Sequence, residues 1–145
     1  MLECRIEARR LNAHRSLARC KDAEITLDTD VNGRPDAFNP AEFLLAALAA
    51  CMIKGIERVV PMLRFELRGV EVAIWGVRQD KPPRTASIEY KLTVDTNEND
   101  ERLALLHRNV MKFGTVYNTL LAGTRLAGVI QRAARATAEA GEGGA

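Results

Sequence analysis

The feature that most constrains this chain is an apolar stretch at residues 39–60, which predicts a long helix. Asn39 is a favourable N-cap, and Pro40 suits the first helical position. Glu42 lies where the acid of a capping box reaches back to the N–H group of the cap. A helix of this length spans about 30 Å, enough to cross a small domain. The remaining segments are therefore expected to pack around it.

The composition of this helix predicts that it is buried. Apolar residues occupy every face from Phe43 to Ile53, which is typical of a helix covered on all sides rather than on one stripe. We expect the helix to end near Val60, because Pro61 cannot easily continue it.

Extended segments surround the helix in the sequence. Alternating apolar and polar residues, or β-favouring runs, predict strands at 2–9, at two parts of 16–27 broken near Lys21-Asp22, and at 70–77, 88–94 and 125–132. The first strand is expected to be half-buried. The strands at 70–77 and 88–94 flank a loop at 79–84, so we expect them to pair antiparallel, with one apolar face covering the central helix.

A second helix is predicted from about Asn99 to Phe113, ended by Gly114, and a short third helix at 115–121. The expected fold class is α+β, with helices packed on an antiparallel sheet. Residues 1–132 are expected to form a single domain. Residues 133–145 are rich in Ala, Glu and Gly and are expected to form a flexible tail.

Charge and cysteine usage bound the setting in which the protein works. Of its 145 residues, 21 are Lys or Arg and 19 are Asp or Glu, a balance that gives no reason to expect nucleic acid as a partner. No secretory signal is expected, because charged residues interrupt the N-terminus, and the uncharged run at 43–53 is too short to span a bilayer. The odd count of three cysteines then predicts reduced thiols in the cytoplasm.

Most familiar chemical motifs are absent from the sequence. It contains no Gly-rich phosphate loop, no Cys-x-x-Cys and no carboxylate-rich metal pattern. Its two histidines make a multi-histidine metal site within one chain unexpected, so we predict neither a metal nor a cofactor. His107 lies on the apolar stripe of the second helix, where packing is favoured over catalysis, and His14 lies in a predicted turn at the surface.

Cys51, within the apolar helix, permits two interpretations. A free cysteine often behaves as a small buried hydrophobe, which composition alone favours. A reactive thiol needs a cation to lower its pKa from about 8.5, and Lys54 and Arg58 follow at one and two helical turns. Cys4 and Cys20 lie on predicted strands and are interpreted as packing residues.

The segment Asn39-Pro-Ala-Glu-Phe-Leu-Leu-Ala-Ala-Leu-Ala-Ala-Cys51 resembles the Asn-Pro-Glu-x-Leu…Ala-Ala-Cys helix of the OsmC/Ohr family, the osmotically induced and organic hydroperoxide resistance proteins. The order of strands and helix after it also fits, and the resemblance extends to about Arg132. It implies an α+β fold with an antiparallel sheet packed around a long Cys-bearing helix. It also implies an intertwined homodimer with active sites at the subunit interface. The active members of the family are thiol peroxidases that reduce organic hydroperoxides.

The resemblance also implies roles for individual residues. Cys51 matches the peroxidatic nucleophile. The family's assisting arginine comes from the N-terminal strands, where Arg15 is the best candidate and Arg19 stands behind it. The family's assisting glutamate directly follows Asn-Pro. This chain has Ala41 there, and Glu42 comes one place later on another face of the helix.

The family's second cysteine, which resolves the oxidised thiol as a disulfide, has no counterpart here. Gly114 falls at its position, and no cysteine follows Cys51. A sulfenic acid on Cys51 would then need an external thiol, or Cys20 or Cys4 brought close by the fold.

Two functions follow as expectations. The first is a one-cysteine reduction of organic hydroperoxides by Cys51 in oxidative stress defence, with an external thiol as reductant and a homodimer as the working form. The alternative is a non-catalytic module that binds a small apolar ligand at the dimer interface, motivated by Ala41 and Gly114. A purely structural or regulatory dimer has no positive support in the sequence.

Overall fold

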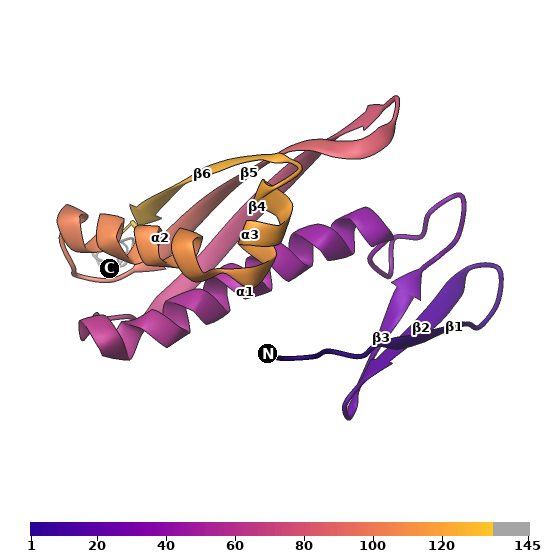
Figure 1. The fold of residues 1–145 in the computed structure, drawn as a ribbon, viewed down its shortest axis with the longest axis horizontal. Helices are drawn as coiled ribbons and strands as arrows, with labels where there is room; N and C mark the ends of the chain where they lie inside the picture. Colours follow the sequence, from indigo (N-terminus) through magenta and orange to yellow (C-terminus); the bar gives the residue numbers. More distant parts are fainter. Residues whose placement is uncertain (135–145) are drawn as a thin grey trace, which may run out of the picture. The chain divides into compact units, whose positions relative to one another are not determined.

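The computed structural model describes residues 1–134, which fall into two compact units divided between Ala46 and Ala47 (Figure 1). Along the chain the elements are β1 (Glu7–Arg10), β2 (Arg15–Cys20), β3 (Ala23–Asp28), α1 (Pro40–Leu63), β4 (Gly69–Asp80), β5 (Pro83–Asp95), α2 (Asp100–Phe113), α3 (Thr115–Leu121) and β6 (Arg125–Arg132). The single domain expected over residues 1–132 stays a prediction. The tail expected at 133–145 lies, from residue 135 on, outside the described residues.

The first unit contains a three-stranded antiparallel sheet in the order β1-β2-β3. The turn between β1 and β2 is held by the Asn12 side chain, whose oxygen accepts the N–H groups of His14 and Arg15 at 2.8 and 3.0 Å. β1 begins at Glu7, later than predicted, and all four of its residues are exposed, so the expectation of a half-buried strand was wrong. Alternation shows which side chains share a face, but it does not say whether another layer covers that face.

The second unit contains a sheet in the order β4-β5-β6. β4 and β5 pair antiparallel as predicted, but the loop expected at 79–84 shrinks to two residues, because β4 runs to Asp80 and β5 begins at Pro83. β6 joins β5 in parallel, so the sheet is mixed rather than wholly antiparallel. The chain reaches β6 through α2 and α3, and such a crossover is what a parallel strand pair requires.

The helices of the second unit lie along one face of this sheet (Figure 1). Asn99 caps α2, accepting the N–H group of Arg102 at 2.9 Å, and the predicted second and third helices and last strand are confirmed. The core comprises alternating side chains of β5 and the inner faces of α1 and α2: Leu48, Met52, Ile56, Val59, Ile88, Tyr90, Leu92, Val94, Leu103, Leu106 and Val110. α1 and α2 meet at Gly55, where an added Cβ would lie 3.9 Å from the Cα of Val110.

α1 is buried on one face only, so the expectation of burial on all sides was wrong for a single chain. The core residues of α1 are closed off from solvent, whereas Ala47, Ala50 and Ile53 are exposed. An all-apolar helix needs cover on every side, and the described part of one chain covers one side.

Within residues 1–134, no helix is long and apolar enough to cross a membrane.

α1 also ends later than predicted, because Pro61 is accommodated within its last turn. A proline there removes one N–H group, and the helix closes beyond it with a Schellman motif. Arg64 takes the left-handed conformation at φ 50°, and the N–H of Phe65 donates to the Val60 carbonyl at 2.9 Å. Arg64 therefore occupies a position that usually holds glycine.

Replacing Arg64 with glycine is expected to stabilise the protein. The left-handed conformation costs a non-glycine residue about 1–2 kcal/mol, whereas glycine loses about 0.5–1 kcal/mol of chain entropy, so a net gain of up to about 1.5 kcal/mol is expected in urea unfolding. Arg58→Gly, the same change at an exposed position inside α1, should instead destabilise by about 1 kcal/mol. An Arg64→Gly protein less stable than wild type would contradict the strain argument.

Candidate functional site

Cys51 lies in α1 with its thiol against the corner between α2 and α3. The thiol is free and partly buried. A Cβ placed on Gly114, which separates the two helices, would lie 3.1 Å from the Cys51 sulfur. The same Cβ would lie 3.0 Å from the Val110 carbonyl oxygen and 3.0 Å from the Cβ of Tyr117, so the corner is already full. The absence of a side chain at residue 114 makes room for the thiol.

The contact between Cys51 and residue 114 has the geometry that a disulfide to the family's second cysteine would need. An S–S bond of about 2.05 Å places the Cβ of one cysteine about 3 Å from the sulfur of the other. The space beside Gly114 therefore has the separation of a disulfide to Cys51, although the chain has no thiol there to form one. The resemblance placed the resolving cysteine at this position, and the fold brings that position against Cys51.

A cluster of aromatic side chains continues from this corner into the core. The Tyr117 ring meets the Tyr90 ring edge-on, with centroids 6.3 Å apart, and the Tyr90 ring meets His107 with centroids 5.7 Å apart. The Tyr90 hydroxyl and the His107 Nε2 are hydrogen-bonded at 2.6 Å. Gly128 on β6 leaves room for Tyr90, because a Cβ there would lie 2.4 Å from the ring.

The hydrogen-bonded groups of this cluster, the Tyr90 hydroxyl and the His107 imidazole, are uncharged at neutral pH. Burial raises the pKa of Tyr90 well above its usual value, and the neighbouring Tyr117 hydroxyl adds to this effect. Burial lowers the pKa of His107, so the imidazole stays neutral. His107 is thus a packed, hydrogen-bonded residue. The two tyrosines were not singled out in the sequence, although a tyrosine on a buried strand face signals a hydroxyl in need of a partner.

Arg15 and Glu42, the two predicted helpers of Cys51, belong to the first unit, whereas Cys51 belongs to the second. Arg15 begins β2, and its Nη2 donates to Asp36 Oδ2 at 2.7 Å. Arg34 donates to the same carboxylate at 3.0 and 3.1 Å. The guanidinium of Arg34, with a smaller contribution from Arg15, lowers the pKa of Asp36.

Glu42 forms the capping box that the sequence predicts. Its carboxylate accepts the N–H of Asn39 at 2.8 Å, and the Asn39 side chain accepts the N–H of Glu42 at 2.9 Å. Glu42 also lines an open pocket with Asp36, the partner of Arg15. Asp36 is therefore bonded to Arg15 and lines the same pocket as Glu42. Their catalytic roles stay predictions.

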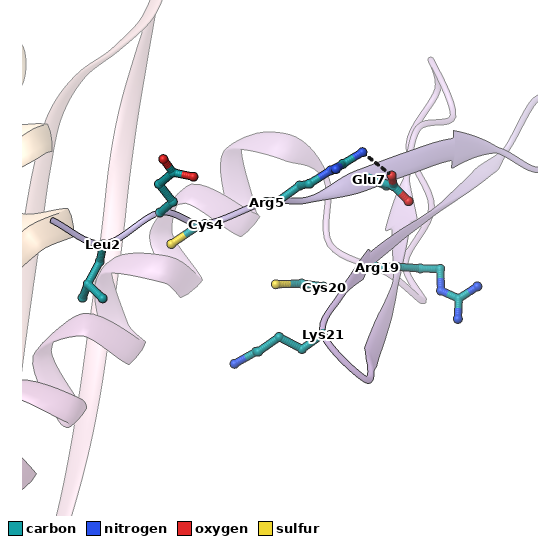
Figure 2. Close-up of a pocket in the computed structure, with 8 residues that line it drawn as sticks. Leu2, Cys4, Arg5, Glu7, Arg19, Cys20 and Lys21 are labelled. Carbon is teal, nitrogen blue, oxygen red and sulfur yellow. Dashed lines mark hydrogen bonds and ion pairs between the residues drawn. The ribbon is translucent and has the colours of Figure 1, made fainter.

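The remaining predicted residues lie elsewhere in the first unit. Arg19, the reserve candidate, pairs with Glu24 across β2 and β3 at 3.1 Å. Its neighbour Cys20 and the N-terminal Cys4 line a separate pocket (Figure 2). Among residues 1–134, no group of three or more His, Cys, Asp or Glu side chains is arranged to hold a metal ion.

The fold and the thiol define a class of protein: an α+β protein in which a long helix presents one cysteine against the corner of two shorter helices. The chain belongs to the OsmC-like protein family, whose model matches residues 33–127. No match to a curated protein sequence accompanies this result.

Solved structures share the fold at low sequence identity. An OsmC-like protein from Mycoplasma pneumoniae is similar with a TM-score of 0.79 and 20% identity, over 91% of this chain and 96% of that one. An organic hydroperoxide resistance protein OsmC from Legionella pneumophila has a TM-score of 0.67 and 15% identity, over 90% and 98%. The organic hydroperoxide resistance protein OhrB of Bacillus subtilis has a TM-score of 0.60 and 18% identity, over 89% and 98%. The α+β fold expected from the sequence is thereby confirmed.

A cysteine introduced at residue 114 is expected to form a disulfide with Cys51. We would make Gly114→Cys with Cys4 and Cys20 replaced by serine, oxidise it with diamide, and identify linked residues by peptide mapping. The expected product is a 51–114 cross-link that dithiothreitol reverses, because the introduced Cβ lies at disulfide separation from Cys51. Gly123→Cys is the matched control, since a Cβ there meets nothing within 4 Å. If Cys51 in the Gly114→Cys protein stays fully alkylatable, the described corner is wrong.

The neutral state of His107 predicts a loss of stability in mild acid. The unfolded chain takes up a proton on this residue near pH 6.5 while the native imidazole resists it, so the free energy of unfolding falls as pH drops from about 6.5 to 5. The slope from this group stays below about 1.4 kcal/mol per pH unit, because the unfolded and native chains differ by at most one bound proton on this residue. His107→Gln should lose this part of the slope and His14→Gln should retain it, measured by urea unfolding across the pH range. Equal slopes for His107→Gln and wild type would refute the assignment.

Proposed function

We propose that this protein reduces organic hydroperoxides with Cys51 as its peroxidatic thiol. The observation that supports this proposal most is the placement of Cys51, which matches the family's cysteine in the sequence, at a helix corner where the missing side chain of Gly114 makes room for its sulfur. Two solved structures of the same fold bear the name organic hydroperoxide resistance protein, which supports the choice of substrate.

In the proposed first step, the Cys51 thiolate attacks the terminal oxygen of the hydroperoxide. The S–O bond forms as the O–O bond breaks, which yields a sulfenic acid on Cys51 and an alkoxide that takes up a proton to leave as an alcohol. A cation near the leaving oxygen would stabilise its charge, and we assign this role to Arg15 with Glu42 assisting. Arg15 would have to exchange its bond to Asp36 for this contact.

Because residue 114 carries no thiol, an external thiol completes the proposed cycle. It attacks the sulfenic sulfur, releases water and forms a mixed disulfide, and a second thiol then releases Cys51 while the two reductant sulfurs become joined. A dithiol reductant would supply both sulfurs from one molecule.

We further propose a homodimer in the cytoplasm as the working form. The exposed apolar face of α1, formed by Ala47, Ala50 and Ile53, is the surface that a second copy would cover. Its burial would satisfy the helix's need for cover on more than one side.

The alternative function, a non-catalytic module for a small apolar ligand, is favoured by Gly114 and Ala41, which stand where the family has catalytic groups. Native mass spectrometry of protein purified from cells distinguishes it: a retained small molecule together with no peroxide turnover would favour the binding module over the enzyme.

Replacing Cys51 with serine is expected to abolish hydroperoxide turnover. Both proteins should carry serine at Cys4 and Cys20, so that Cys51 is the only thiol that differs between them. With cumene hydroperoxide and dihydrolipoamide, we expect the rate to fall by at least about 100-fold, because the nucleophile is gone. Dimedone should label Cys51 of the parent protein after peroxide treatment. Equal rates of consumption with and without Cys51 would refute the proposal.

The same assay also tests the role assigned to Arg15. Arg15→Gln should slow turnover by at least about tenfold if Arg15 stabilises the leaving alkoxide. Arg19→Gln is the matched control, because it removes the same charge from the same strand, at the reserve candidate. It should leave the rate within about twofold. The reverse pattern would transfer the role to Arg19.

A further inference from the structure

The first unit holds a pocket that contains two thiols. Cys4, from the segment before β1, and Cys20, at the end of β2, both line it, and both are free (Figure 2). Figure 2 shows the two sulfur atoms facing the same open space from neighbouring segments of chain. All residues that line this pocket belong to the first unit, whereas Cys51 belongs to the second.

The strand register explains why these two side chains share a face. The last pair of the β1–β2 ladder is Glu7 with Arg19, and its continuation would set Ile6 opposite Cys20. Cys4, two residues before Ile6, then lies on the same face and diagonally across from Cys20. Diagonal neighbours have Cα atoms about 7–8 Å apart, whereas a disulfide requires about 4.4–6.8 Å. An inward shift of about 1–2 Å at Cys4 would therefore permit a bond.

Such a shift breaks no hydrogen bond of the β-ladder. β1 begins only at Glu7, so Cys4 stands three residues outside the ladder, in a segment whose residues are all exposed. Cys20, in contrast, is held in β2 opposite Ala23 and is partly buried. One thiol is thus fixed in the sheet and the other is on a chain end that can approach it.

Three cationic side chains and two carboxylates line the pocket of the two sulfurs. Arg5, Arg19 and Lys21 line the pocket, and the two arginines are paired with Glu7 and Glu24 at 2.9 and 3.1 Å. Lys21 forms no ion pair within residues 1–134, and Figure 2 shows it extending on the same side of the chain as the Cys20 sulfur. Thiol oxidation and exchange proceed through the thiolate, which neighbouring cations stabilise.

We propose that Cys4 and Cys20 form a redox-active dithiol that an organic hydroperoxide converts into a disulfide. The Cys20 thiolate attacks the terminal oxygen, the O–O bond breaks, and the alkoxide takes up a proton to leave as an alcohol. The Cys4 thiolate then attacks the Cys20 sulfur, and hydroxide leaves with a proton as water. Two thiols and one hydroperoxide thus give one disulfide, one alcohol and one water. A small-molecule thiol restores both cysteines by exchange.

The test uses full-length protein with Cys51→Ser, so that the pair reacts without the helix thiol and the proposed function of Cys51 stands or falls separately. The protein receives one equivalent of cumene hydroperoxide, and free thiols are then blocked with iodoacetamide. Cleavage after glutamate should yield residues 4–7 joined to residues 8–24, a product that dithiothreitol separates. Both thiols should be lost together rather than one at a time.

Three variants of the Cys51→Ser protein sharpen the result. With Cys4→Ser added, Cys20 should stop at a sulfenic acid that dimedone labels. With Cys4→Ser and Arg5→Cys together, the thiol moves to the opposite strand face, and cross-linking should be at least about tenfold slower. Lys21→Gln should slow the reaction of Cys20 several-fold. Persistence of two separately alkylatable thiols, or disulfides only between different chains, would overturn the proposal.

Discussion

The structure depends on how α1 is covered. Leu48, Met52, Ile56 and Val59 form an inner face that packs with the core of the second unit, and Gly55 allows close approach to Val110 on α2. An almost wholly apolar helix has no polar face suited to water, so the segments that cover it must be arranged around it. One chain covers the inner face, and the outer face remains exposed. The fold is therefore built around a helix whose sequence is suited to more burial than one chain provides.

The surroundings of Cys51 follow from that packing. Because α1 lies against α2, its thiol reaches the corner at Gly114, where a missing side chain leaves the sulfur its space. A glycine at this corner is consistent with both of the functions weighed for the chain, since it accommodates a thiol and removes an in-chain partner for it. The neighbouring Tyr90–His107 pair is neutral and adds no cation to the corner.

The first unit holds the remaining thiols. Arg15 and Arg34 converge on Asp36, while Cys4 and Cys20 share a separate pocket with three cationic and two anionic side chains. Glu42 shows how one residue can fit two descriptions. Its bonds to Asn39 account for it fully as a capping acid, and capping needs no catalytic role.

The sequence by itself determined the features that depend on neighbouring residues: the capping box at Asn39 and Glu42, the extents of α2, α3 and β6, and the family of the chain. These were predictable because periodicity and capping act within a few residues. Only the structure decided the end of α1 at Leu63, the parallel pairing of β6, the contact of Cys51 with Gly114, and the bond between Tyr90 and His107. Each of the last three joins segments far apart in the sequence, and the first rests on a left-handed arginine where local rules favour glycine.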